Sequence, residues 1–354
     1  MVYIKGLGAV SPAGWGVASL RDVVQRCKSL ATMDLPGPSS APSVSVRKVP
    51  PISSKPGFFA HPRLRRTSSI AQYAVAAALE ALGGERRGTG ENSQRLGIIY
   101  CAMAGCVKYS QRFYDETLRD PATASPLVFP ETVFNAPASH LGALLGTSAV
   151  NYTLVGDPGT FLQGLALGAD WVLSGRIDDC VVIGAEELDW LVANAFRLFD
   201  PAGIVSEGAG AVYMGREPGP LGAVALHEVT APQNLSPRQS RARAALRVRA
   251  QLKDVIAGLL CDSCNGVERL DADEESAWRD WDSPRWSPKK ICGEGFMAAA
   301  GWQCVLAADS LARGMFDSAT VNVVGVNQQA IAARFLRGEC HPKGAQVTGM
   351  NSGN

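Results

Sequence analysis

The stretch from Asn151 to Glu187 constrains the fold of this 354-residue chain more than any other. An apolar run leads into the turn GDPG, which is followed by helical periodicity over about 160–174 and by a second apolar run ending in Gly-Ala-Glu. The pattern predicts a strand, a sharp turn, an amphipathic helix and a buried strand. Such a unit belongs to a sheet with helices packed on its faces.

The turn of this unit lies where many enzymes present a nucleophile. Backbone N–H groups and the helix dipole at such a helix N-terminus stabilise a developing oxyanion. Here the turn offers only Asp157 and Pro158. Asp157, directly before a proline, is expected to be the N-cap of the helix. The sequence therefore predicts the architecture of an active-site turn without its nucleophile.

Strand and helix signals alternate through both halves of the chain, which predicts an α/β protein with mostly parallel sheets. Gly-Pro punctuation near 218–221 divides it into regions 1–217 and 218–337, followed by a poorly ordered tail, 338–354. Strands are expected at 96–100, 206–214, 222–229 and 320–326. Helices are expected at 17–27, 67–82 and 237–260, with a further helix ending at 311. A Pro- and Ser-rich surface loop is expected at 35–57.

Charge, cysteines and hydropathy exclude several classes of protein. A net charge of +1 gives no global field that would recruit nucleic acid or an anionic membrane, and no apolar run is long enough to span a bilayer. Nine irregularly placed cysteines without a signal sequence predict reduced thiols and a cytoplasmic location. Four of them, Cys261, Cys264, Cys292 and Cys304, are spaced too unevenly for a zinc site, so we expect no metal.

Several linked segments, spread over about 2–335, resemble the β-ketoacyl synthase family. They are GLGAVSPAGWG, HPRLRRTSSIAQYAVAAALEAL, FPETVFNAPASHLGALLGTSAVNYTLV, IGAEE and SEGAGAVYM. The resemblance implies the thiolase-like fold, in which two duplicated βαβαβαββ halves form five α-β-α-β-α layers.

The same resemblance locates three catalytic positions, and each carries an unexpected residue. Counting back from the Gly-Ala-Glu strand end, the family's nucleophilic cysteine falls on Pro158, which has neither a thiol nor a backbone N–H. In DSCNGVERLDADEESAW, which is similar to the first histidine motif, the histidine is replaced by Asn265. In KKICGEGFMAAAG, which is similar to the second, it is replaced by Glu294.

Two further positions complete this comparison. Lys289 or Lys290 retains the lysine of the second histidine motif, and Val326 in VNVVGVNQQ replaces the gatekeeper phenylalanine. Condensation needs a thiolate to accept the acyl group and two imidazoles to support decarboxylation. The resemblance therefore implies a degenerate member without condensing activity, similar to the chain length factors that pair with a true ketosynthase.

A chain length factor works through partners. The resemblance implies a heterodimer with a catalytic ketosynthase, or a homodimer, and a segment 106–137 that faces the partner's acyl tunnel. We expect length-determining side chains there, namely Tyr109, Phe113 and Tyr114.

An acyl carrier protein is the other expected partner. Arg63, Arg65 and Arg66 precede the first long helix, where the family docks its carrier, and they are either this docking site or simply a solvated helix start. Phosphopantetheine would arrive only on the carrier, so no cofactor of the chain's own is expected. A second basic run, from Arg238 to Lys253, is expected to be a solvated helix face.

Two alternatives remain open. The chain could be a carrier-dependent decarboxylase or acyltransferase, with Asn265, Lys289 and Glu294 lining a pocket and water as nucleophile. It could also be a homodimeric scaffold without catalytic function.

Overall fold

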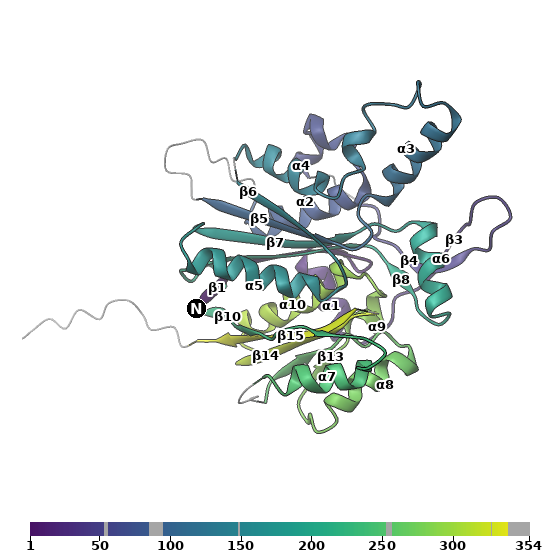
Figure 1. The fold of residues 1–354 in the computed structure, drawn as a ribbon. Helices are drawn as coiled ribbons and strands as arrows, with labels where there is room; N and C mark the ends of the chain where they lie inside the picture. The colour runs from purple at the N-terminus through teal and green to yellow at the C-terminus, as the bar shows by residue number, and fades with distance from the viewer. Residues whose placement is uncertain (53–55, 85–94, 148, 253–256, 327, 339–354) are drawn as a thin grey trace, which may run out of the picture.

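Two successive runs of secondary structure with the same order build the protein. The computed structural model describes the whole chain except residues 53–55, 85–94, 148, 253–256, 327 and 339–354 (Figure 1). The first run consists of β1 (Val2–Ser11), α2 (Ser69–Ala81), β5 (Leu96–Ala102), α4 (Ala136–Leu145), β6 (Val150–Val155), α5 (Thr160–Leu173), β7 (Asp179–Glu186) and β9 (Gly208–Gly215). The second consists of β10 (Val224–Val229), α7 (Arg241–Arg249), β12 (Leu259–Cys261), α8 (Glu268–Ala277), β13 (Arg285–Trp286), α10 (Met297–Ala312), β14 (Ser318–Val324) and β15 (Gln329–Arg337).

The strand order shows the duplication directly. The first run gives the order β6-β5-β7-β9-β1, and the second gives β13-β12-β14-β15-β10. In each run the first three strands are parallel and the last two are antiparallel to their neighbours. The two sheets meet where β1 pairs with β10, through Val2↔Leu226 and Tyr3↔Ala225. This short junction joins the sheets at one edge.

The protein has five layers, as the resemblance in sequence implies. Helices α5 and α10 lie between the two sheets, α2 and α4 cover the outer face of the first, and α7 and α8 cover the second (Figure 1). The middle layer places the N-termini of α5 and α10, and the loops before them, between the two halves. Pro158 lies in the loop before α5, and Glu294 lies in the loop before α10.

The middle layer is closely packed. Every residue of α10 from Met297 to Leu311 is buried. Gly301 of α10 contacts Gly210 of β9 so closely that a Cβ added to Gly210 would lie 2.5 Å from the Gly301 carbonyl carbon. Small side chains here allow helix and sheet backbones to approach, which fixes the height of α10 above the first sheet.

Several parts of the expected secondary structure were wrong or incomplete. The predicted loop 35–57 contains β4 (Val44–Arg47), which pairs with β8 (Val205–Ser206) and with β3 (Met33–Leu35). The predicted helix 237–260 is too long, because Leu259–Cys261 enters the second sheet as β12. The final strand, Gln329–Arg337, was not predicted.

The remaining elements are connections between the layers. They are β2 (Gly14–Trp15), α1 (Val17–Gln25), η1 (Gly57–Ala60), η2 (Pro62–Leu64), α3 (Val107–Arg119), η3 (Phe129–Glu131), α6 (Trp190–Phe199), β11 (Gln233–Asn234) and α9 (Pro288–Cys292).

None of the described helices combines the length and apolar character that crossing a bilayer requires. Residues 339–354 of the predicted tail lie outside the described part of the chain.

Candidate functional site

The site centres on the turn between β6 and α5, where Pro158 lies. Helix α5 begins at Thr160, and its N-cap is Gly159, which makes no side-chain capping bond. The Thr160 N–H donates to the carbonyl oxygen of Asp157 at 2.7 Å, which closes the turn through the backbone. The predicted tight turn is confirmed, with the imino acid Pro158 at its centre.

Asp157 has a different role from the predicted N-cap. Its side chain is 1% exposed, and its Oδ2 accepts hydrogen bonds from the backbone N–H groups of Gln328 and Gln329, both at 3.0 Å. The carboxylate thus crosses from the first half of the chain to the loop before β15. Burial raises the pKa of Asp157, while these two hydrogen bonds and nearby Lys289 oppose the rise.

Lys289 and Glu294 form a buried ion pair. The Lys289 Nζ lies 2.9 Å from Glu294 Oε2, and the two side chains are 1% and 2% exposed. The other oxygen of Glu294 accepts from the Phe296 N–H at 2.9 Å. The ammonium and the carboxylate neutralise each other, and neither side chain is an imidazole.

Phe296 is strained. Its φ of 48° and ψ of −113°, directly before α10, are unusual for a residue with a side chain. Phe296 and Val326 line a cavity of about 310 Å³. The other lining residues are Met103, Ala104, Leu191, Val192, Ala195, Phe196 and Phe199, so the wall of the cavity is apolar.

A buried acid supports one wall of this cavity. Glu186, at the end of β7, accepts hydrogen bonds from the N–H groups of Met103 at 2.5 Å and Ala104 at 3.1 Å. Complete burial raises its pKa to about 8, against the opposing effect of these hydrogen bonds and one from Met297. This carboxyl group fixes the loop after β5 to the start of α10.

Asn265 is hydrogen-bonded to its own loop and to the start of α8. Its Oδ1 accepts from the Val267 N–H at 3.1 Å, and its N–H donates to Asp271 Oδ1 at 2.8 Å. Asp271 also pairs with Lys290 at 3.2 Å. The structure thus brings Lys289, and not Lys290, to Glu294.

In the described part of the chain, one cluster of three residues has side chains of the kinds that bind metal ions in other proteins. Potential ligand atoms of Cys264, Asp271 and Glu275 lie within 4.8 Å of one another. Lys290 pairs with both carboxylates, at 3.2 Å and 3.6 Å, and so supplies the positive charge there. Burial raises the pKa of the Cys264 thiol well above its usual range, which disfavours the thiolate that binds metals.

Arg241 is a site residue that the sequence analysis missed. It was expected on a solvated face, yet its side chain is 14% exposed. Its guanidinium donates to the carbonyl oxygens of Gly325 and Val326, the latter at 3.1 Å. An arginine in a run of arginines gives no sequence signal for such a contact, because it depends on where the loop before β15 folds.

The three arginines of the expected carrier-docking site are exposed. Arg63 lies in η2, and Arg65 and Arg66 follow it directly before α2. Helix α3 lies close by, since the Tyr109 hydroxyl donates to the carbonyl oxygen of Arg66. The arginines and the expected tunnel-facing helix therefore share one side of the molecule.

The other two tunnel candidates lie farther along α3, which has no buried residues. The Phe113 ring packs at 5.4 Å from the Phe129 ring, and Tyr114 is 62% exposed. Further exposed apolar side chains are Leu118, in the last turn of α3, and Leu127, Phe129, Val133 and Phe134 beyond the helix.

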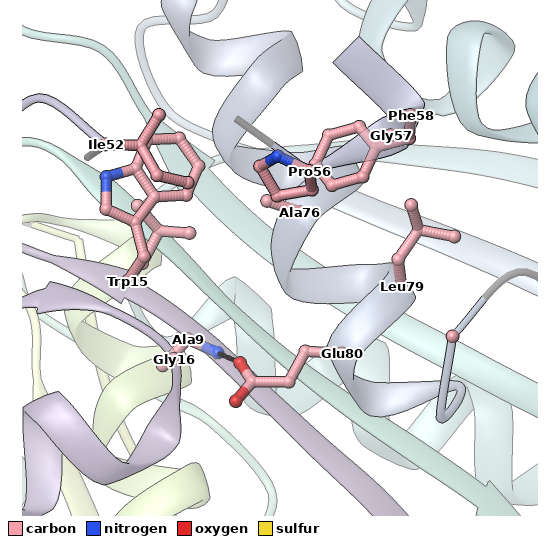
Figure 2. Close-up of a pocket in the computed structure, with 12 residues that line it drawn as sticks. Ala9, Trp15, Gly16, Ile52, Pro56, Gly57, Phe58, Ala76, Leu79 and Glu80 are labelled. Carbon is pink, nitrogen blue, oxygen red and sulfur yellow. Dashed lines mark hydrogen bonds between the residues drawn. The ribbon is translucent and has the colours of Figure 1, made fainter. Parts of the chain in front are cut away.

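A second cavity, of about 430 Å³, lies away from this site (Figure 2). It is lined mainly by apolar side chains, including Trp15, Phe58 and Leu79. The Glu80 carboxylate at its edge accepts hydrogen bonds from the N–H groups of Ala9 and Val17, both at 2.9 Å. Glu80 thereby holds the β1–β2 hairpin and the start of α1 against α2.

The duplicated halves, the shared middle helices and the turn before α5 define the thiolase-like fold of ketosynthases. No protein-family model and no curated protein sequence matches the chain. Solved structures do match over nearly the whole chain, and the three compared below are ketosynthases or their complexes.

The ishigamide ketosynthase/chain length factor is 18% identical, with a TM-score of 0.77 over 95% of this chain and 99% of the other. A type II polyketide ketosynthase bound to a hexaketide, in complex with its acyl carrier protein, is 15% identical, with a TM-score of 0.76 over 95% and 99%. A β-ketoacyl synthase from Burkholderia phymatum is 14% identical, with a TM-score of 0.79 over 96% and 99%. At these identities the likeness establishes the fold.

Proposed function

We propose that this chain is a non-condensing ketosynthase-like subunit. It pairs with a catalytic ketosynthase and shapes that partner's acyl tunnel, as a chain length factor does, in polyketide, polyene or fatty-acid-type chain assembly. The observation that carries the proposal is the combination of Pro158 at the turn and the buried Lys289–Glu294 pair, 2.9 Å apart. This arrangement offers no thiolate for acyl transfer and no imidazole for decarboxylation.

An exposed sheet edge supports the pairing with a second chain. Strand β6 is terminal in the strand order, and its side chains at Val150, Tyr152 and Val155 are 37%, 50% and 54% exposed. Proteins usually protect such apolar edges with charges, prolines or a covering element. A partner subunit that adds its own strand here would cover them.

Helix α3 supports the proposed effect on product length. It carries Tyr109, Phe113 and Tyr114 on a segment without buried residues, so substitutions there cost little stability. A partner seated against this surface would sense the size of these side chains. The exposed Arg63, Arg65 and Arg66 nearby offer cationic groups to an acidic carrier protein.

Co-expression with a catalytic ketosynthase from the same biosynthetic cluster tests the proposal. We expect a heterodimer by native mass spectrometry, and no acyl adduct on this chain after incubation with acyl carrier protein. Phe113→Ala and Tyr114→Ala should shift the product length, whereas the matched control Leu198→Ala, at an exposed position of α6, should not. A chain that stays homodimeric beside an active ketosynthase would contradict the proposal and support the scaffold alternative.

The apolar cavity beside Val326 favours a second candidate function. A volume of about 310 Å³ accommodates an acyl chain, so a carrier-dependent decarboxylase or acyltransferase remains compatible with the fold. Intact-mass analysis of malonyl carrier protein incubated with the purified chain distinguishes the two. Loss of carbon dioxide or of the acyl group would favour the second candidate, and an unchanged mass the first.

A further inference from the structure

The contact between Asp157 and the loop before β15 is unusually close. Gly325 lies so near that a Cβ there would be 1.9 Å from Asp157 Oδ2. On the far side of the loop, Arg241 donates to the carbonyl oxygens of Gly325 and Val326. The loop is thus held by a cation at its carbonyl oxygens and by an anion at its N–H groups.

The N–H groups that meet Asp157 form an arrangement that binds anions. The backbone N–H groups of Gln328 and Gln329 are consecutive, and both donate to Asp157 Oδ2 at 3.0 Å. Successive N–H groups that converge on one point form a concave nest for an oxyanion. Here the anion comes from the other half of the same chain, at a position that is 1% exposed.

Only one oxygen of the Asp157 carboxylate is hydrogen-bonded in the structure. Its second oxygen, Oδ1, is buried without a hydrogen-bond partner in the structure. A buried acceptor without a donor costs stability, so Oδ1 does not account for the position of the side chain. The two N–H groups that bind Oδ2 and the positive charges of Lys289 and Arg241 hold the carboxylate in place.

We propose that the Gln328 and Gln329 N–H pair is a small-oxyanion site that the chain fills itself with the Asp157 carboxylate. Removing this carboxylate opens the site to a free monocarboxylate of the size of formate. In the intact protein the turn that carries Pro158 is tied to the loop that carries Val326, and these two donors are not open to an oxyanion of a bound acyl group. The proposal concerns the chain alone and holds with or without a ketosynthase partner.

Chemical rescue tests this self-filled site. Asp157→Ala should lower the melting temperature by about 5 °C, because two backbone N–H groups lose a buried acceptor. Sodium formate should then raise the melting temperature of D157A along a saturating curve, as a ligand that binds only the folded state does. Sodium chloride at equal ionic strength is the control, and it should not reproduce the rise.

The wild type and Asp157→Asn are the matched controls. Both keep an oxygen that accepts from the two N–H groups, so formate should change neither melting temperature more than chloride does. Equal responses of D157A and the wild type to formate, or a D157A variant as stable as the wild type, would overturn the proposal.

A second measurement covers the case in which D157A does not fold. A neutral amide oxygen accepts hydrogen bonds more weakly than a carboxylate. Hydrogen–deuterium exchange at the Gln328 and Gln329 amides should therefore be faster in D157N than in the wild type, while exchange in α2 stays the same. Unchanged exchange at these amides would also overturn the proposal.

Discussion

At the scale of single residues, the site shows how charged groups are accommodated in the interior of the protein. Lys289, Glu294, Asp157 and Arg241 are all buried or nearly so, and each has an oppositely charged or hydrogen-bonding partner. Isolated charges at such depth would be strongly destabilising. The stabilities of these groups therefore depend on one another. Replacing both members of a pair should lower the free energy of unfolding by less than the sum of the two single replacements.

The Lys289–Glu294 pair gives the first prediction. Lys289→Met or Glu294→Gln alone should each lower the free energy of unfolding by about 3–5 kcal/mol, because each leaves a buried charge unpaired. The double variant K289M/E294Q should cost less than the sum of the two. Urea unfolding of the four proteins measures this coupling, and strictly additive losses would contradict it.

Glu186 gives a prediction about pH. Its pKa in the folded protein is about 8, above its ordinary value of 4.5, so the folded state retains a proton that the unfolded state has lost. Stability due to this group should therefore fall as pH rises from about 5 to 8. Glu186→Gln should flatten that part of the curve of unfolding free energy against pH, whereas the exposed Glu217→Gln should leave it unchanged. Parallel curves for E186Q and the wild type would contradict the assignment.

At the scale of elements, sequence patterns predicted what local periodicity encodes. Local sequence patterns placed α2 and α5 within two residues of their observed bounds, at Ser69–Ala81 and Thr160–Leu173. Strand β4, in contrast, lies in a Pro- and Ser-rich stretch and pairs with β8, which is far away in the sequence. For the site, the resemblance singled out Pro158, Lys289 and Glu294. The contact of Asp157 with Gln328 and Gln329, in contrast, arises only when the two halves meet, and that of Arg241 depends on where the loop before β15 folds.

The exposed strand β6 gives a prediction at this scale. Lysines at its edge should discourage strand addition by another chain, because a charged ammonium would be buried in the contact. The variant V150K/V155K should weaken association with the partner subunit at least ~10-fold while leaving the fold intact, since both positions are exposed. Leu198→Lys, on α6, is the control, and analytical ultracentrifugation is the measurement. Equal affinities for the two variants would place the interface elsewhere.

At the scale of the whole molecule, the two halves share one interior. Helix α10 of the second half packs against β7 and β9 of the first, and α5 of the first half contacts β10 and β15 of the second. One continuous cluster of buried apolar residues runs through both halves. A half that folded alone would expose this apolar middle layer to water.

Cooperative unfolding is the corresponding prediction. Circular dichroism and tryptophan fluorescence should report the same single transition in urea, because neither half is stable without the other. The fragment 1–217 should show no cooperative transition of its own. A chain ending at residue 338 is the control and should unfold at the same midpoint as the full chain. Two separate transitions would show that the halves fold independently.

The close packing of α10 has a consequence for how such a chain can change over generations. Gly210 and Gly301 allow no added carbon between helix and sheet, whereas α3 has no buried side chain. In a saturation-mutagenesis experiment, few substitutions should therefore be tolerated along α10 and many along α3. Substitutions can therefore accumulate on α3 over generations, while the helix at the centre preserves the ancestry of the fold.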